Sequence, residues 1–162
     1  MEKYIMANTT FSGPVTSTNG FITGTGVNST VTAATLTVTA DAYNGQTINL
    51  SRAAGIVVTL PAATGTNAVY KFLVTTTVTT NNYIIQVANA TDTMNGLASV
   101  AGTTGSVFST LPASDTITMS GTTTGGLIGS YVQVTDVAAG EFLVQATLVG
   151  SGTPATPFSA AV

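Results

Sequence analysis

Glu141-Phe-Leu-Val-Gln-Ala-Thr-Leu-Val149 is the stretch that decides the fold, because every second residue from Phe142 to Leu148 is apolar. Successive side chains of an extended chain point to opposite faces, so Phe142, Val144, Ala146 and Leu148 share one face. Such alternation predicts a β-strand with one buried side. The segment 69–77 repeats the pattern, with Tyr70, Phe72 and Val74 on one face and Lys71 and Leu73 on the other.

Working outward from these two segments, short periodic runs separated by Gly, Asn and Pro predict further strands. They lie at 35–39, 47–50, 55–60, 83–87, 105–110, 116–120 and 127–137. Asn44-Gly45 predicts a two-residue hairpin turn between the first two of these runs. Asn81-Asn82 and Asn95-Gly96 predict two more turns. Regular short strands of this kind predict an antiparallel β-sandwich or a jelly-roll-like barrel over residues 31–162.

The composition leads to the same all-β class. The chain has 162 residues, of which 34 are threonine, while helix-forming Glu and Lys together number four. Thr, Val, Ile and Tyr fit a pleated, half-buried surface. A chain of this length can bury enough surface to be stable without a disulfide or a metal ion, and it contains no cysteine.

The chain carries few charges, three Lys or Arg and six Asp or Glu, with a net charge of −3. Nucleic-acid binding relies on many basic residues that neutralise phosphates, so we expect no nucleic-acid partner. Each long uncharged stretch is interrupted by Gly, Pro, Asn or Thr, and Lys3 is not followed by an apolar core, so we expect neither a membrane span nor an export signal. Free domains rely on surface charges for solubility. We therefore expect the chain to be covered by protein, in a homo-oligomer or a larger assembly.

Residues 1–30 differ from the remainder, because their apolar residues are isolated among Thr, Ser, Asn and Gly. Such a segment cannot form a core, and it is either disordered or an extended arm that lies on another surface. If it docks, its apolar residues are the contacts with a capsid or a neighbouring subunit, and these are Phe11, Pro14, Val15, Phe21 and Ile22.

Catalysis would have to use the few carboxylates, since the chain has no histidine and no cysteine. Asp41, Asp92, Asp115 and Asp136 each stand near a turn or strand end, where aspartate commonly accepts hydrogen bonds from nearby backbone N–H groups. No clustered acidic spacing indicates a metal site, and no glycine-rich loop between a strand and a helix indicates a phosphate site. We therefore expect no enzyme, no metal and no cofactor. A polysaccharide-acting enzyme is a weak alternative, because the chain has no Trp to stack on a sugar.

Three stretches of the sequence, 6–21, 53–92 and 150–158, carry a resemblance to known proteins. The first contains Met6-Ala-Asn-Thr-Thr-Phe-Ser-Gly-Pro-Val15 and Ser17-Thr-Asn-Gly-Phe21, and the last is Gly150-Ser-Gly-Thr-Pro-Ala-Thr-Pro-Phe158. The central stretch contains Ala53-Ala-Gly-Ile-Val-Val-Thr-Leu-Pro-Ala-Ala-Thr-Gly65, Tyr70-Lys-Phe72 and Tyr83-Ile-Ile-Gln-Val-Ala-Asn-Ala-Thr-Asp92. The chain resembles small virion proteins of tailed bacteriophages, of the head-decoration (cement) and head-fibre type. These stretches are packing and turn patterns and hold no functional residue to transfer. Residues 1–5 depart from the pattern, which indicates Met6 as an alternative start.

The resemblance implies a capsid decoration protein, made in the host cytoplasm and located on the outside of the virion. Its partner is then the major capsid protein, and the expected assembly is a trimer that stabilises the shell through buried area. The alternative is a head- or tail-fibre module for host-surface adhesion. Copy number separates the two, because decoration requires hundreds of copies on a virion and a fibre requires tens.

Overall fold

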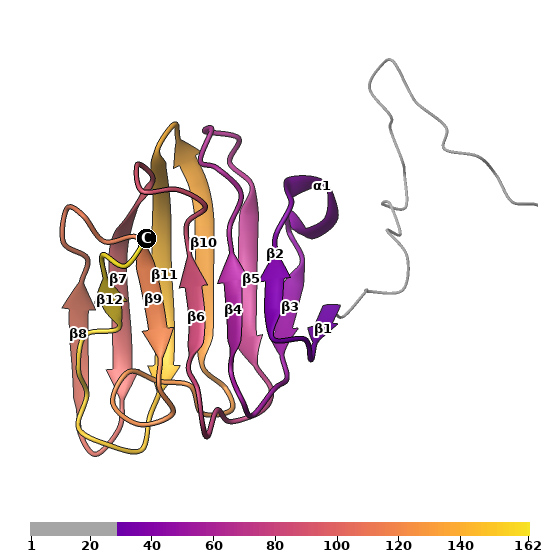
Figure 1. The fold of residues 1–162 in the computed structure, drawn as a ribbon. Coiled ribbons are helices and arrows are strands. Elements are labelled where there is room, and N and C mark those ends of the chain that lie inside the picture. The colour runs from indigo at the N-terminus through magenta and orange to yellow at the C-terminus, as the bar shows by residue number, and fades with distance from the viewer. Residues whose placement is uncertain (1–28) are drawn as a thin grey trace, which may run out of the picture.

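Two β-sheets packed face to face form the protein in a computed structural model that describes residues 29–162 (Figure 1). The larger sheet has seven strands, in the order β1 (Ser29–Val31), β3 (Thr47–Leu50), β5 (Val69–Val74), β10 (Tyr131–Ala138), β11 (Glu141–Val149), β7 (Thr93–Ala101) and β8 (Gly105–Ser109). The smaller sheet has five, in the order β12 (Phe158–Ser159), β9 (Thr116–Met119), β6 (Tyr83–Gln86), β4 (Ile56–Thr59) and β2 (Thr35–Thr37). The all-β sandwich prediction is therefore confirmed, and the two sheets with open edges favour it over a closed barrel.

The strand pairing is mixed, which corrects the expectation of purely antiparallel sheets. Five neighbouring pairs among the described strands are parallel and five are antiparallel. The reason lies in the connections, because the first six strands alternate between the two sheets. Each time the chain returns to a sheet it runs in its earlier direction, so β1, β3 and β5 are parallel, as are β2, β4 and β6.

The hairpin predicted at Asn44-Gly45 is wrong. The strands on either side of it, β2 and β3, belong to different sheets, and a single helical turn, α1 (Ala40–Tyr43), lies between them. Gly45 has a φ of 74° and donates its N–H to the Val69 carbonyl at 2.7 Å. The Asn44 side chain accepts the Val69 N–H at 2.9 Å. The Asn-Gly pair therefore ends a crossover and fastens it to β5.

The turn predicted at Asn95-Gly96 is also wrong, because both residues lie inside β7. Gly96 has a φ of 154°, and a Cβ at this position would overlap the Val144 carbonyl oxygen of β11. Glycine is used here for the close approach of two strands and not for a change of chain direction.

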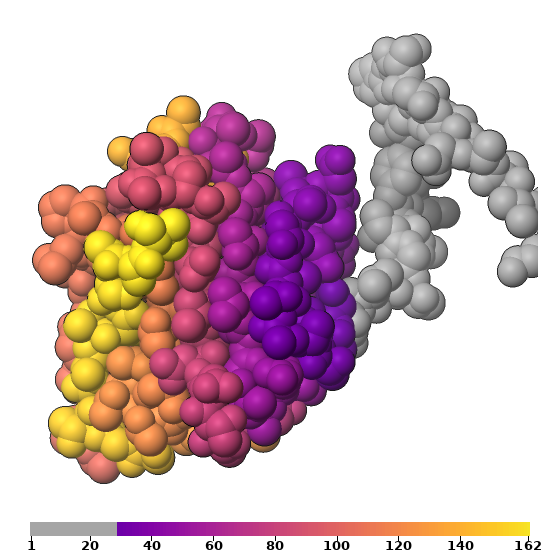
Figure 2. All heavy atoms as spheres, viewed as in Figure 1, coloured from indigo at the N-terminus to yellow at the C-terminus, as the bar shows by residue number. Residues whose placement is uncertain are grey.

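Most predicted strands are present, with ends within a few residues of those expected, and β3 and β11 have the predicted bounds. Patterns in the sequence did not indicate β1, β7, β12 or α1. The core lies between the sheets, and the predicted core aromatics Tyr70, Phe72, Tyr83 and Phe142 are all buried in it. Figure 2 shows the C-terminal residues, in yellow, along one side of the molecule and the first described strands, in indigo, along the opposite side.

Candidate interaction surface

The outer face of the seven-stranded sheet, called here the large outer face, is built from side chains that alternate with the core residues. The strand registers align these side chains in rows across the sheet. One row contains Asn49, Leu73, Tyr131, Thr147, Ser99 and Val107, and the next contains Thr47, Lys71, Gln133, Gln145, Leu97 and Ser109. The result is a broad face of mostly uncharged side chains.

Charges are scarce on the large outer face. Among the outward-facing residues of its described strands, Lys71 and Glu141 carry the charges, and they stand on separate strands, β5 and β11. A surface that only meets water usually mixes many charges of both signs. Depletion of charge together with Tyr and aliphatic side chains is typical of the centre of a protein interface.

Three large apolar side chains project from adjacent strands of this face. Leu143 on β11, Leu97 on β7 and Val107 on β8 retain 40%, 49% and 67% of their accessible surface. Their strand neighbours Val144 and Ala98 are fully buried, so the projection follows from the alternation of side chains. The strand registers place the three side chains in different rows, so they form a diagonal patch in which Leu97 lies about 7–8 Å from both Leu143 and Val107. An exposed group of apolar side chains of this kind is a candidate interaction site.

A shallow hollow of about 370 Å³ lies beside this patch. It lies on β11, β7 and β8, and its lining includes the small residues Ser99, Ala101 and Gly105 together with Val107 and Thr147. Such a hollow has room for an apolar side chain of a partner protein. It contains no ionisable side chain in its lining.

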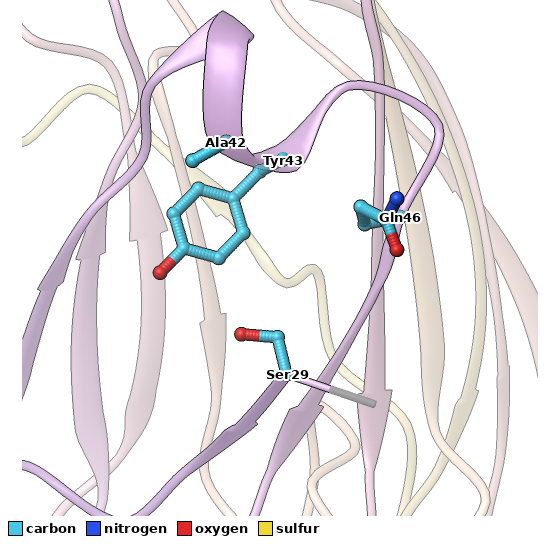
Figure 3. Close-up of a pocket in the computed structure, with 4 residues that line it drawn as sticks. All are labelled: Ser29, Ala42, Tyr43 and Gln46. Atoms are coloured by element: carbon cyan, nitrogen blue, oxygen red, sulfur yellow. The ribbon is translucent and has the colours of Figure 1, made fainter. Parts of the chain in front are cut away.

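A second hollow, of about 280 Å³, lies beside β1 and α1 at the other end of the large sheet (Figure 3). The Tyr43 ring and the Ser29 hydroxyl point toward the same space, and Ala42 and Gln46 complete the lining. Hydroxyl and amide groups bind a neighbour by hydrogen bonds.

The outer face of the five-stranded sheet is a weaker candidate for an interface. Its central row contains Thr35, Val57, Ile84 and Thr118. Val57 and Ile84 are already half-buried, so a partner would remove less apolar surface from water there than on the large outer face. A hollow of about 280 Å³ nearby includes Arg52, but its guanidinium already donates to the carbonyls of Ala54 and Gly55 at 3.2 and 2.8 Å.

Asp136 holds the loop at 64–66 against the start of β5. Its carboxylate accepts the backbone N–H groups of Thr64, Gly65 and Thr66 at 3.0, 2.7 and 3.0 Å. The hydroxyls of Thr66 and Thr64 donate to it at 2.7 and 3.4 Å. Burial raises the pKa of Asp136, but these hydrogen bonds outweigh burial and lower the pKa below its ordinary value.

Asp115 holds the C-terminus in a similar way. Its carboxylate accepts the N–H groups of Ala161 and Val162 at 2.8 and 3.3 Å and the Thr116 hydroxyl at 2.7 Å. Burial raises the pKa of Asp115, and the bonds from Ala161, Thr116 and Val162 reverse the effect, so the pKa is lowered. The bonds from Ala161 and Val162 to Asp115 span 46 and 47 residues of sequence, and those to Asp136 span 70 to 72. The expectation of bonds to backbone N–H groups is confirmed, but for these two the partners are distant rather than local.

Asp92 completes the set of buried carboxylates. One of its oxygens accepts the Ala63 N–H and the Asn89 side-chain amide, each at 2.9 Å. Within residues 29–162, no group of three or more His, Cys, Asp or Glu side chains is placed to hold a metal ion. No helix in that range is long and apolar enough to cross a membrane.

The sequence-predicted docking residues Phe11, Pro14, Val15, Phe21 and Ile22 lie outside the described residues. The exposed patch on the large outer face was not predicted. Leu143 carried a signal, because it is apolar at a position that alternates with the buried residues of its strand. Leu97 carried none, because Asn95-Gly96 was interpreted as a turn.

Comparisons of the chain with family models, curated proteins and solved structures find no match.

Proposed function

We propose that this chain is a non-enzymatic structural virion protein that binds the outside of a tailed-phage head and stabilises it. The large outer face carries this proposal, because it presents Leu97, Val107 and Leu143 on adjacent strands with few charges around them. The partner is the major capsid protein, and the location is the capsid exterior after synthesis in the host cytoplasm.

The size of the face supports such a contact. Seven strands spaced by about 4.8 Å, with an average length of about six residues at about 3.3 Å each, give a face of about 700 Å². A specific interface buries about 800 Å² on each partner. The face thus supplies most of a standard interface, and an arm formed by the residues that precede β1 would supply the remainder. Docking by Phe11, Pro14, Val15, Phe21 and Ile22 stays a prediction, as does the trimer.

The state of the carboxylates supports a role without catalysis. A general acid or base has to exchange a proton with a substrate. The carboxylates of Asp92, Asp115 and Asp136 instead accept hydrogen bonds from the fold itself, and each joins segments far apart in the sequence. Their contribution is stability, which a protein on the outside of a particle requires.

A head- or tail-fibre module for host-surface adhesion is the second candidate. The winding of the first six strands favours it, because they alternate between two sheets with parallel neighbours. That is the geometry of a short β-helix, a form that builds elongated repeats.

The number of copies in purified virions tests both candidates. Quantitative mass spectrometry against a labelled standard should give hundreds of copies of the chain for each head, and labelling with an antibody should place it on the head surface. Tens of copies on a projecting structure would favour the fibre module. Absence from the particles would refute both.

A further inference from the structure

The edges of the two sheets differ in length, and β8 is the longest edge strand. The other three edges are β1 and β2 with three residues each and β12 with two. β8 has five residues, Gly105–Ser109, and Figure 1 shows no described element on its outer side. A strand of two or three residues offers little to pair with, whereas five residues offer a complete site for an added strand.

The hydrogen bonds of β8 with β7 fix which backbone groups are free. The Thr110 N–H donates to the Gly96 carbonyl at 3.0 Å, and the Gly102 N–H donates to the Thr104 carbonyl at 2.8 Å. In an antiparallel pair hydrogen-bonded residues alternate, so Ser106 and Phe108 bond to β7 as well. The N–H and C=O groups of Gly105, Val107 and Ser109 therefore point away from the sheet.

The β8 edge lacks the features that normally prevent pairing. Natural edges are protected by charged residues, proline or a bulge. β8 contains no charge and no proline, and its register with β7 is unbroken. No charged residue occurs between Asp92 and Asp115 in the sequence. Val107, at the centre of the strand, keeps 67% of its surface exposed.

The sequence of β8 is complementary to itself in an antiparallel arrangement. If Val107 faces Val107 of a second copy, Gly105 faces Ser109 and Ser109 faces Gly105. All three outward-pointing residues of each copy then fall in hydrogen-bonded pairs, and every free N–H and C=O finds a partner. The two Val107 side chains lie side by side on the large outer face, and no charge meets a like charge.

The geometry points to β8 as a self-association edge, at which two copies of this chain join their large sheets across a two-fold axis centred on Val107. This goes beyond the proposed function and does not depend on it. The contact leaves the β1 edge and the outer surfaces of both sheets open, so it is compatible with a capsid contact and with a three-fold contact elsewhere.

Single cysteines test the pairing, since the chain has none of its own. In the proposed pair the two Cα atoms of residue 107 are about 5.5 Å apart, within disulfide range. Those of residue 109 are about 14 Å apart, because each Ser109 faces Gly105 of the other copy. The full-length variants Val107→Cys and Ser109→Cys are treated with a short thiol-reactive cross-linker. The expected result is a covalent dimer for Val107→Cys, with at least tenfold less for Ser109→Cys.

A charge variant tests the contact without a cross-link. Val107→Lys places two ammonium groups side by side, whereas Thr37→Lys adds the same charge on exposed β2 of the other sheet. Sedimentation should give a mass of two or six chains for wild type and Thr37→Lys, and a smaller mass for Val107→Lys with an unchanged circular dichroism spectrum. Equal cross-linking of the two cysteine variants, no cross-linking of either, or a wild-type mass of one or three chains would overturn the proposal.

Discussion

Replacing Asp136 by asparagine tests whether a buried carboxylate fastens the 64–66 loop. The carboxylate accepts five hydrogen bonds, three of them from consecutive backbone N–H groups. An asparagine can keep its oxygen toward Thr64 and Gly65, but its NH₂ group then faces the Thr66 N–H, where two donors meet. Hydrogen bonds to a charged group contribute about 1.5–3 kcal/mol each. The expected loss for Asp136→Asn is therefore about 2–3 kcal/mol.

Thermal unfolding followed by circular dichroism measures this loss. For a domain of this size 1 kcal/mol corresponds to about 3–4 °C, so the Tm at pH 7 should fall by about 6–12 °C. Asp41→Asn is the matched control, because it removes the same charge from an exposed position in α1. The control should change the Tm by about 2 °C at most, as is usual for surface substitutions.

The pH dependence of the difference is a second test of the same bonds. The pKa of Asp136 is lowered in the folded protein, so its stabilisation is present above the unfolded pKa of about 3.9 and is lost as the pH falls through the folded pKa. The gap in Tm between wild type and Asp136→Asn should therefore shrink in strong acid. An unchanged Tm at pH 7, or a gap that is the same at pH 7 and in strong acid, would refute this reasoning.

Three further predictions concern strand packing, pH and the N-terminal segment. Gly96→Ala should lower the free energy of unfolding by about 3 kcal/mol or more, because a Cβ there meets the Val144 carbonyl. The control Gly105→Ala should have little effect, because no atom lies within 4 Å of its added Cβ. Denaturant titration compares the two variants. The chain has no histidine, and the pKa values of Asp115 and Asp136 are lowered. Thermal scans should therefore give a Tm that moves by less than about 5 °C between pH 5.5 and 8. A larger shift would indicate a carboxylate of raised pKa. Removing residues 1–28 should leave the sandwich folded by circular dichroism and lower its occupancy on phage heads, and equal occupancy would show that the segment takes no part in docking.

Local patterns in the sequence were enough to predict most strands and the core. The alternation in 141–149 and 69–77 reports which side of a strand is buried, and Phe142, Tyr70 and Phe72 lie where that alternation places them. This information is contained within a few neighbouring residues, since side chains alternate along any strand.

Such local patterns could not predict which of the two sheets each strand joins. Asn44-Gly45 allows a hairpin, but the same φ near 74° also ends a helical turn, and only the distant Val69 backbone decides between them. The sequence around Gly96 indicates a turn, and only the position of β11 beside it shows that glycine is needed there for a close contact between strands. The parallel pairs follow from connections between sheets, which depend on contacts between segments far apart in the sequence.

The position of the candidate surface could not be predicted from the sequence. The shortage of charges in the sequence leads to the expectation of a surface covered by protein, which stays a prediction, while the position of Leu97 and Val107 required the register of β7 and β8. Asp115 and Asp136 were predicted to accept backbone N–H groups, and the sequence could not identify donors 46 to 72 residues away.

Binding of the purified chain to phage heads that lack it is the measurement that tests the central claim most directly. Heads are incubated with wild type, Leu143→Lys or the control Thr37→Lys, and bound protein is quantified after sedimentation of the heads. Wild type and control should saturate the heads, while a charge buried at Leu143 should weaken binding at least tenfold, equivalent to about 1.4 kcal/mol. Absence of wild-type binding would contradict the account, and so would equal binding of all three proteins.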